Sequence, residues 1–240
     1  MELKITKTRF RTLFAAAVST LIAVYGAQAQ DKVLNLYSAR HYSTDEALYS
    51  NFTKATGIKI NRLEGGEDQL LQRIKSEGAN SPADVFLTVD AGRLWIADQE
   101  GVFAPIQSKV LNERIPAAYR LASNTWYGLS TRARVMVVDK LKVKPGEIAT
   151  YEDLADPKWK GQVCTRSGSH VYMLSLISSI IEHAGAEKAE AWAKGVVANL
   201  ARQPKGGDTD QIKAVAAGEC AVALSNSYYI ARMIKSDKAD

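Results

Sequence analysis

Residues 84–99, with the sequence DVFLTVDAGRLWIADQ, decide the fold class. The apolar run over residues 84–89 is continuous, as in strands that are covered on both faces inside a parallel sheet. Asp90 follows as a candidate helix cap, and residues 91–99 are predicted to form a helix. A strand that leads directly into a helix is part of a βαβ unit. The stretch therefore predicts an α/β protein with a parallel sheet and right-handed crossovers.

The same alternation of strand and helix continues on both sides of this stretch. Upstream, we predict strands at 33–37 and 58–63, a helix that opens at Ser43 or Thr44 and ends at Gly57, and a helix at 68–76. Downstream, we predict β-rich runs at 126–129 and 134–138, a helical turn at 151–154, strands at 162–166 and 219–224, and helices at 169–183, 187–200 and 208–217. The two series predict two α/β lobes, which we assign to residues 30–131 and 132–240.

Residues 1–29 are predicted to be a secretory signal peptide. Basic residues precede a mostly apolar run over residues 13–24, and Ala27-Gln28-Ala29 matches a small-x-small cleavage site. The run is short for a bilayer span, although a retained membrane anchor stays open as the alternative. At the other end, residues 235–240 are polar and have no terminating element behind them, so we expect the natural protein to continue.

The charge of the chain excludes one class of partner. The formal net charge is +5, but the predicted signal peptide carries four basic residues against one acidic residue, which leaves about +2 for the rest. No basic stripe stands out, and we expect no nucleic-acid partner.

Two cysteines, Cys164 and Cys220, remain in an exported chain. An even count is compatible with one disulfide bridge between neighbouring strands, and two buried free thiols are the alternative. Two sulfurs without a C-x-x-C motif do not indicate a thiolate metal site.

Tyrosines gather where predicted strands end. Ligands of open α/β folds bind beyond the carboxyl ends of the strands, and in a two-lobed protein the cleft between the lobes is the expected site. The tyrosines at or just after these ends are Tyr42, Tyr172, Tyr228 and Tyr229. Each has a structural alternative; Tyr172, for example, would also suit the core face of its helix.

Other polar residues near the strand ends also have two interpretations. His41 is either a ligand beside Tyr42 or a surface or capping residue, and Arg132 is either an anion-binding or a solvated residue. Arg134 is expected to be solvated, and His170 is expected to belong to a helix start. Asp90 fits a helix cap.

The adjacent pair Tyr228-Tyr229 suggests a metal. A phenolate is a hard, anionic oxygen donor, and such donors suit hard cations such as Fe³⁺. Neighbouring residues of a strand face opposite ways, so both tyrosines reach one ion only from a turn or from the first turn of a helix. Residues 225–227, Ser-Asn-Ser, provide capping chemistry for such a helix. The hypothesis is a ferric site; the alternative is an ordinary packed aromatic pair.

Several stretches resemble a known family. They are residues 36–42 (LYSARHY), 64–68 (EGGED), 84–94 (DVFLTVDAGRL) and 225–229 (SNSYY). The chain resembles the periplasmic ferric-ion-binding proteins of bacterial iron ABC importers, a branch of the extracellular solute-binding proteins, over essentially all residues after the predicted signal peptide.

The resemblance implies a two-lobed periplasmic-binding-protein fold that closes on Fe³⁺ in a central cleft, with its C-terminal part missing from this chain. The metal ligands that it implies are His41, Tyr42, Tyr172, Tyr228 and Tyr229. Arg40 and Arg132 resemble arginines that hold carbonate or another anion in some members in place of a protein ligand. Whether Tyr42 binds the ion or such an anion takes its place stays open. The implied partner is the membrane permease of the importer, and we expect a monomer in the periplasm.

Two other classes of function remain as alternatives. An enzyme is disfavoured because the chain has no G-x-S-x-G, no H-E-x-x-H and no His-Cys or paired-carboxylate arrangement that stands out. A same-fold binding protein for a polyamine, thiamine or phosphonate would use Tyr42, Trp126 and Tyr228 as an aromatic box. A polyamine also needs convergent carboxylates, for which Asp90 is the candidate in the sequence.

Overall fold

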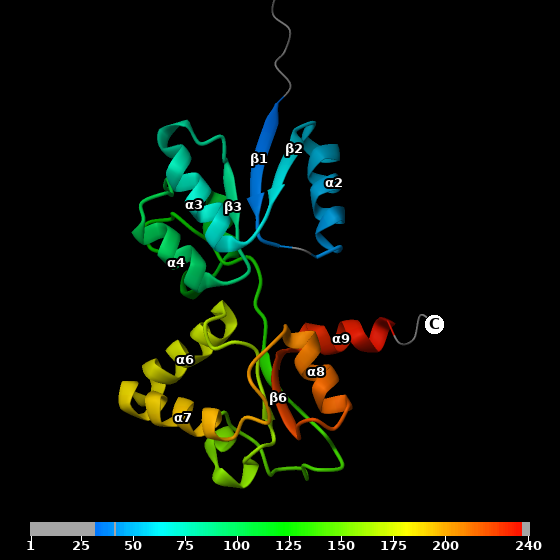
Figure 1. Ribbon diagram of the computed structural model, residues 1–240. Coiled ribbons are helices and arrows are strands. Elements are labelled where there is room, and N and C mark those ends of the chain that lie inside the picture. Colours follow the sequence, from blue (N-terminus) through cyan, green and yellow to red (C-terminus); the bar gives the residue numbers. More distant parts are fainter. Residues whose placement is uncertain (1–31, 41, 237–240) are drawn as a thin grey trace, which may run out of the picture. The chain divides into compact units, whose positions relative to one another are not determined.

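The computed structural model describes residues 32–40 and 42–236 (Figure 1). The chain divides into two compact units between Thr88 and Val89. This division lies earlier than the lobe boundary predicted at residue 131, because Val89 packs with Val171 and Tyr172 of the second unit. The lobe boundary itself stays a prediction.

The first unit is built on a parallel sheet, as predicted. Strands β1 (Val33–Ser38), β2 (Lys59–Glu64) and β3 (Val85–Leu87) pair in the order β2-β1-β3. Helix α2 (Asp45–Thr56) links β1 to β2, and α3 (Glu67–Glu77) follows β2, with a 3₁₀ turn at Gly78–Asn80. Leu36 and Tyr37 of β1 are buried together with Leu70 and Leu71 of α3, which form the core of this unit.

Gly57 ends α2 as predicted. Its φ of 72° lies in the left-handed region, where a residue with a Cβ is strained, and its N–H donates to the carbonyl oxygen of Thr53.

The second unit contains a mixed sheet, and here the prediction of parallel strands is wrong in part. Strands β4 (Arg134–Val138), β5 (Val163–Cys164) and β6 (Val222–Asn226) lie in the order β4-β6-β5, and β4 runs antiparallel to β6. Strand β5 is parallel to β6. The strand predicted at residues 126–129 is also wrong, since this segment makes only an isolated bridge between Arg120 and Tyr127.

Helices and 3₁₀ turns complete the second unit, and Figure 1 labels α4, α6, α7, α8 and α9 among them. They are α4 (Ala91–Gln99), α5 (Lys109–Arg114), 3₁₀ turns at Ala117–Tyr119, Glu152–Ala155 and Pro157–Trp159, α6 (Val171–Ala184), α7 (Ala186–Ala198), α8 (Asp208–Ala216) and α9 (Ser227–Ser236). Every residue of β6 is buried. The core around it includes Leu154, Trp159, Trp192 and Leu224, whose apolar burial stabilises this unit.

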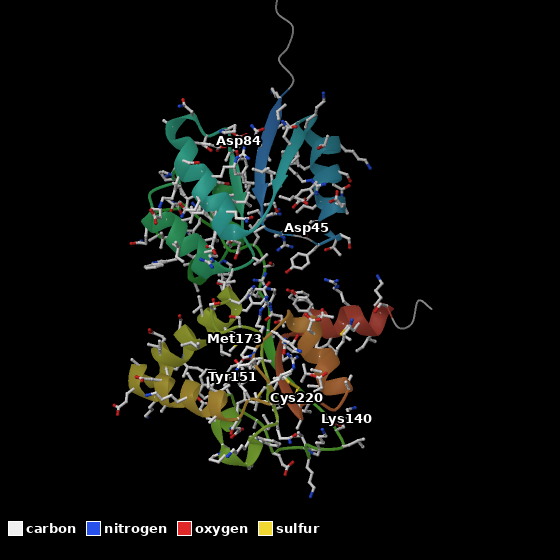
Figure 2. All side chains as sticks on the ribbon, in the orientation of Figure 1. Asp45, Asp84, Lys140, Tyr151, Met173 and Cys220 are labelled. Atoms are coloured by element: carbon white, nitrogen blue, oxygen red, sulfur yellow. A yellow bond between two sulfur atoms is a disulfide. The ribbon has the colours of Figure 1, made fainter. Side chains whose placement is uncertain are left out.

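A disulfide joins Cys164 at the end of β5 to Cys220, which precedes β6. Both residues are buried with Ala214, Val215 and Ala223, and Figure 2 labels Cys220. The bridge confirms the disulfide prediction and excludes the alternative of two free thiols.

Several predictions concern residues outside the described part. The predicted signal peptide at residues 1–29 and the predicted metal ligand His41 both fall there. Within residues 32–40 and 42–236, no helix has the length and apolar character needed to cross a membrane.

Candidate metal site

Three of the predicted ligands meet in the second unit. Tyr172 lies in the first turn of α6, and Tyr228 and Tyr229 lie in the first turn of α9. The hydroxyl oxygens of Tyr172 and Tyr228 are 3.3 Å apart and share a hydrogen bond. The rings of Tyr228 and Tyr229 are 4.3 Å apart between centroids, at an angle of 31°. The three side chains therefore form one cluster of phenols.

The sheet explains why these tyrosines meet. Strands β5 and β6 are parallel neighbours, so their carboxyl ends lie at the same edge. The chain leaves β5 through a short loop into α6, and it leaves β6 at Asn226 directly into α9. Helix starts therefore lie side by side beyond this edge, where ligands of α/β folds bind.

His170 caps the start of α6, as predicted. Its Nδ1 accepts a hydrogen bond of 3.2 Å from the backbone N–H of Tyr172, and its ring packs edge-on against the Tyr172 ring at 4.7 Å. Burial, followed by the nearby charge of Arg166, lowers the pKa of His170 to about 4. The imidazole is therefore neutral at pH 7, which keeps Nδ1 available as an acceptor.

Three arginines lie against the ring of Tyr172. The guanidinium carbons of Arg132, Arg134 and Arg166 are 5.7, 5.8 and 5.1 Å from its centroid. Cations at such distances are attracted by the electron-rich ring face. Tyr172 is only 5% exposed, and its ring lies among these three guanidinium groups.

The prediction that Arg134 is solvated is wrong. Its side chain is 9% exposed and forms an ion pair with Asp208, with Nη1 and Oδ2 2.7 Å apart. Arg166 pairs with the same carboxylate at 3.2 Å. The sequence suggested only a helix start for Asp208, because nothing local to it indicates that its partner lies 74 residues earlier.

The remaining predicted site residues belong to the first unit. Arg40 and Tyr42 follow β1, and the Arg40 guanidinium lies 4.7 Å from the centre of the Tyr42 ring. Arg40 also forms a two-pronged ion pair with Asp45, at 2.7 and 2.9 Å. This hydrogen bonding to Asp45 raises the pKa of Arg40, and the carboxylate balances the guanidinium charge. His41, between Arg40 and Tyr42, lies outside the described residues.

Asp90 acts as a helix cap, as predicted. Its carboxylate accepts a hydrogen bond of 2.8 Å from the N–H of Gly92 in α4 and one of 2.7 Å from the hydroxyl of Ser175. The first contact caps α4, and the second ties its start to α6.

The donor set favours phenolate ligands. Among residues 32–40 and 42–236, no group of three or more His, Cys, Asp or Glu side chains is placed to hold a metal ion. The cluster of Tyr172, Tyr228 and Tyr229 instead offers hard oxygen donors, which suit a small, highly charged cation.

The chain is similar to known proteins of iron uptake. Residues 80–240 match the family model described as "Bacterial extracellular solute-binding protein". The chain is 53% identical to Iron uptake protein A1 of Synechocystis over 87% of this chain and 58% of that protein. It is 46% identical to Iron uptake protein A2 of the same organism, over 98% of this chain and 68% of that protein.

The chain is also similar to a protein of known structure. A Trichodesmium protein in complex with iron and citrate ligands is 59% identical and superimposes with a TM-score of 0.78, over 83% of this chain and 63% of that one. The chain thus spans about three fifths of the length of this protein and of Iron uptake protein A1. The match over residues 80–240 and the similarity to proteins of iron uptake show that the chain belongs to the bacterial extracellular solute-binding proteins.

Proposed function

We propose that the protein captures ferric iron in the periplasm and delivers it to the permease of an ABC importer, without catalysing a reaction. The observation that carries the proposal is the phenol cluster, in which the Tyr172 and Tyr228 hydroxyl oxygens are 3.3 Å apart and Tyr229 stacks on Tyr228. Relatives with iron uptake or periplasmic Fe(3+) binding in their names support the cargo and the compartment.

Charge explains why such a site suits Fe³⁺. A free tyrosine titrates near pH 10, so the cation must displace phenolic protons at neutral pH. The phenolates of Tyr172, Tyr228 and Tyr229 then carry three negative charges, which balance one ferric ion. Affinity should therefore fall as the pH is lowered, because protons compete with the ion for the phenolate oxygens.

The first unit supplies the remaining candidates. The resemblance predicts His41 and Tyr42 as further ligands, and both Arg40 and Arg132 resemble arginines that hold a synergistic anion such as carbonate. Asp45 already balances Arg40, whereas among the described residues Arg132 has no carboxylate partner. We therefore favour Arg132 for the anion. The citrate in the Trichodesmium structure supports an oxygen-rich anion beside the iron.

The organic-solute alternative has less support. A polyamine would need carboxylates that converge on its ammonium groups. Asp90 is engaged as the cap of α4, and Asp208 is paired with two arginines. Asp90 and Asp208 therefore already have structural partners.

The decisive experiment is a visible-light titration with ferric citrate. Purified protein should develop a phenolate-to-iron charge-transfer band, and Tyr228→Phe combined with Tyr229→Phe should abolish it. Tyr119→Phe is the matched control, because Tyr119 is exposed and lies in the same unit outside the cluster. A wild type without a band and without bound iron refutes the ferric function, and an unchanged band in the double variant refutes the site.

The contribution of the first unit can be tested in the same way. We expect Tyr42→Phe and His41→Ala each to weaken iron binding or to shift the band, because both change the set of donor atoms. Variants that match the wild type in both respects would restrict the ligands to the second unit.

A further inference from the structure

A buried carboxylate is linked to the phenol cluster through two arginines and one backbone N–H. Asp208 is the first residue of α8, and its side chain is fully buried. Its Oδ2 accepts a hydrogen bond of 2.7 Å from Arg134 Nη1 and one of 2.8 Å from the backbone N–H of Asn226. Its Oδ1 accepts one of 3.2 Å from Arg166 Nη1. A single carboxylate thus joins β4, the loop after β5, the end of β6 and α8.

Each residue that Asp208 contacts lies close to a tyrosine of the cluster, either along the chain or in space. Asn226 is the last residue of β6, two positions before Tyr228, so its bond to Asp208 fixes the point where α9 begins. Arg134 and Arg166, which Asp208 holds, lie against the ring of Tyr172.

A further contact links Arg134 to the same helix as Tyr172. Arg134 Nη2 is 3.6 Å from the sulfur of Met173, which Figure 2 labels. Arg134 therefore touches two consecutive residues of α6 while its Nη1 is bonded to Asp208.

The ion pairs around Asp208 contain more positive than negative charge. Two guanidinium groups, with side chains 9% and 13% exposed, share one carboxylate. The Nε atoms of both arginines are buried and have no hydrogen-bond partner among the described residues. Asp208 is therefore the main anchor of both guanidinium groups, and without it two buried cations would lose their counter-charge.

We propose that Asp208 is a positioning residue for the metal site, which acts through Arg134, Arg166 and Asn226 to hold the three tyrosines in place for a metal ion. Residues that orient metal ligands in this way contribute to affinity although they never touch the metal. The consequence for iron rests on the proposed function, whereas the consequence for the geometry of the tyrosines does not.

The test is Asp208→Asn in the full chain. Asparagine has nearly the same shape and keeps an oxygen that accepts from the N–H of Asn226, but it removes the charge that pairs with the arginines. We expect iron affinity, measured by competition with citrate, to fall roughly 10- to 100-fold. We also expect the charge-transfer band to shift and the Tyr172–Tyr228 hydroxyl distance to change in a crystal structure of the metal-free variant.

A control separates positioning from general loss of stability. Leu154→Ala opens a cavity at a fully buried residue of the core cluster that does not contain Tyr172. This variant should also be less stable than the wild type, yet it should keep the affinity and the band. An equal loss of affinity in Leu154→Ala would refute the positioning role.

Other outcomes decide the proposal as well. A folded Asp208→Asn variant with wild-type affinity, band and tyrosine geometry overturns it. If that variant does not fold, Arg166→Gln carries the test, because it leaves Asp208 paired with Arg134 in a one-to-one ion pair. Wild-type affinity and band in Arg166→Gln then overturn the proposal, and a smaller change in the same direction supports it.

The two proposals can fail separately. A wild type that binds no iron refutes the proposed function. The tyrosine geometry in metal-free structures of the wild type and of the Asp208 or Arg166 variant then decides the positioning role by itself.

Discussion

Removing the disulfide should cost the second unit about 4 kcal/mol of unfolding free energy. The bridge between Cys164 and Cys220 closes a loop with a sequence separation of 56, which contains α6, α7 and α8. Closure of a loop of that length removes chain entropy from the unfolded state worth about 4 kcal/mol at 25 °C. This is a large share of the roughly 5–15 kcal/mol that typically stabilises a domain.

The variant that tests this value is the double substitution Cys164→Ala and Cys220→Ala. Alanine fits the surroundings of both positions, because the neighbours Ala214, Val215 and Ala223 are small and apolar. The assay is guanidinium unfolding followed by tryptophan fluorescence. All four tryptophans lie after residue 88, so the signal reports on the second unit alone.

Reductant provides the control. The reduced wild type should lose about as much unfolding free energy as the double variant, since the same loop constraint is released in both cases. The double variant should not respond to reductant. A loss below about 1 kcal/mol in both proteins would contradict the entropic argument, because it would mean that the unfolded second unit does not gain the freedom expected of a released loop.

Three smaller predictions concern local structure. Gly195→Ala should cost about 1–3 kcal/mol of unfolding free energy, because the new Cβ would lie 2.7 Å from that of Ala155. Asp90→Ala should cost about 1 kcal/mol through the lost cap of α4, measured by the same fluorescence assay. Because the pKa of His170 falls to about 4 in the folded state, its contribution to stability is complete above pH 6.5 and is lost as the pH falls toward 4. His170→Asn should reduce this acid sensitivity, and an unchanged pH profile would argue against it.

Local signals predicted much of the fold. The helix over residues 91–99 has the predicted bounds, and Gly57 ends α2 in the left-handed conformation that favours glycine. Strand direction was harder to predict. Strand β4 pairs with β6, more than 80 residues later, and the direction of such a pairing depends on the path of the chain between them. The residue pattern of a short buried strand does not contain that information.

In the candidate site too, some features could be predicted from the sequence and others could not. Tyr172 and Tyr228 are 56 residues apart, yet their proximity followed from the rule that ligand-binding residues lie beyond strand ends. The ion pair of Arg134 with Asp208 could not be predicted, because an arginine in a strand and an aspartate at a helix start are each ordinary surface residues on their own. Only the folded chain brings them together inside the second unit.

The direct junction of β6 with α9 makes the spacing of the tyrosine pair intolerant of insertions and deletions. The strand ends at Asn226 and the helix begins at Ser227, so no loop residue lies between them. One inserted residue would rotate Tyr228 and Tyr229 about the helix axis by about 100°, away from Tyr172. Homologues that keep these tyrosines should therefore vary the lengths of other loops and leave this junction unchanged, which makes it a reliable anchor for aligning the family.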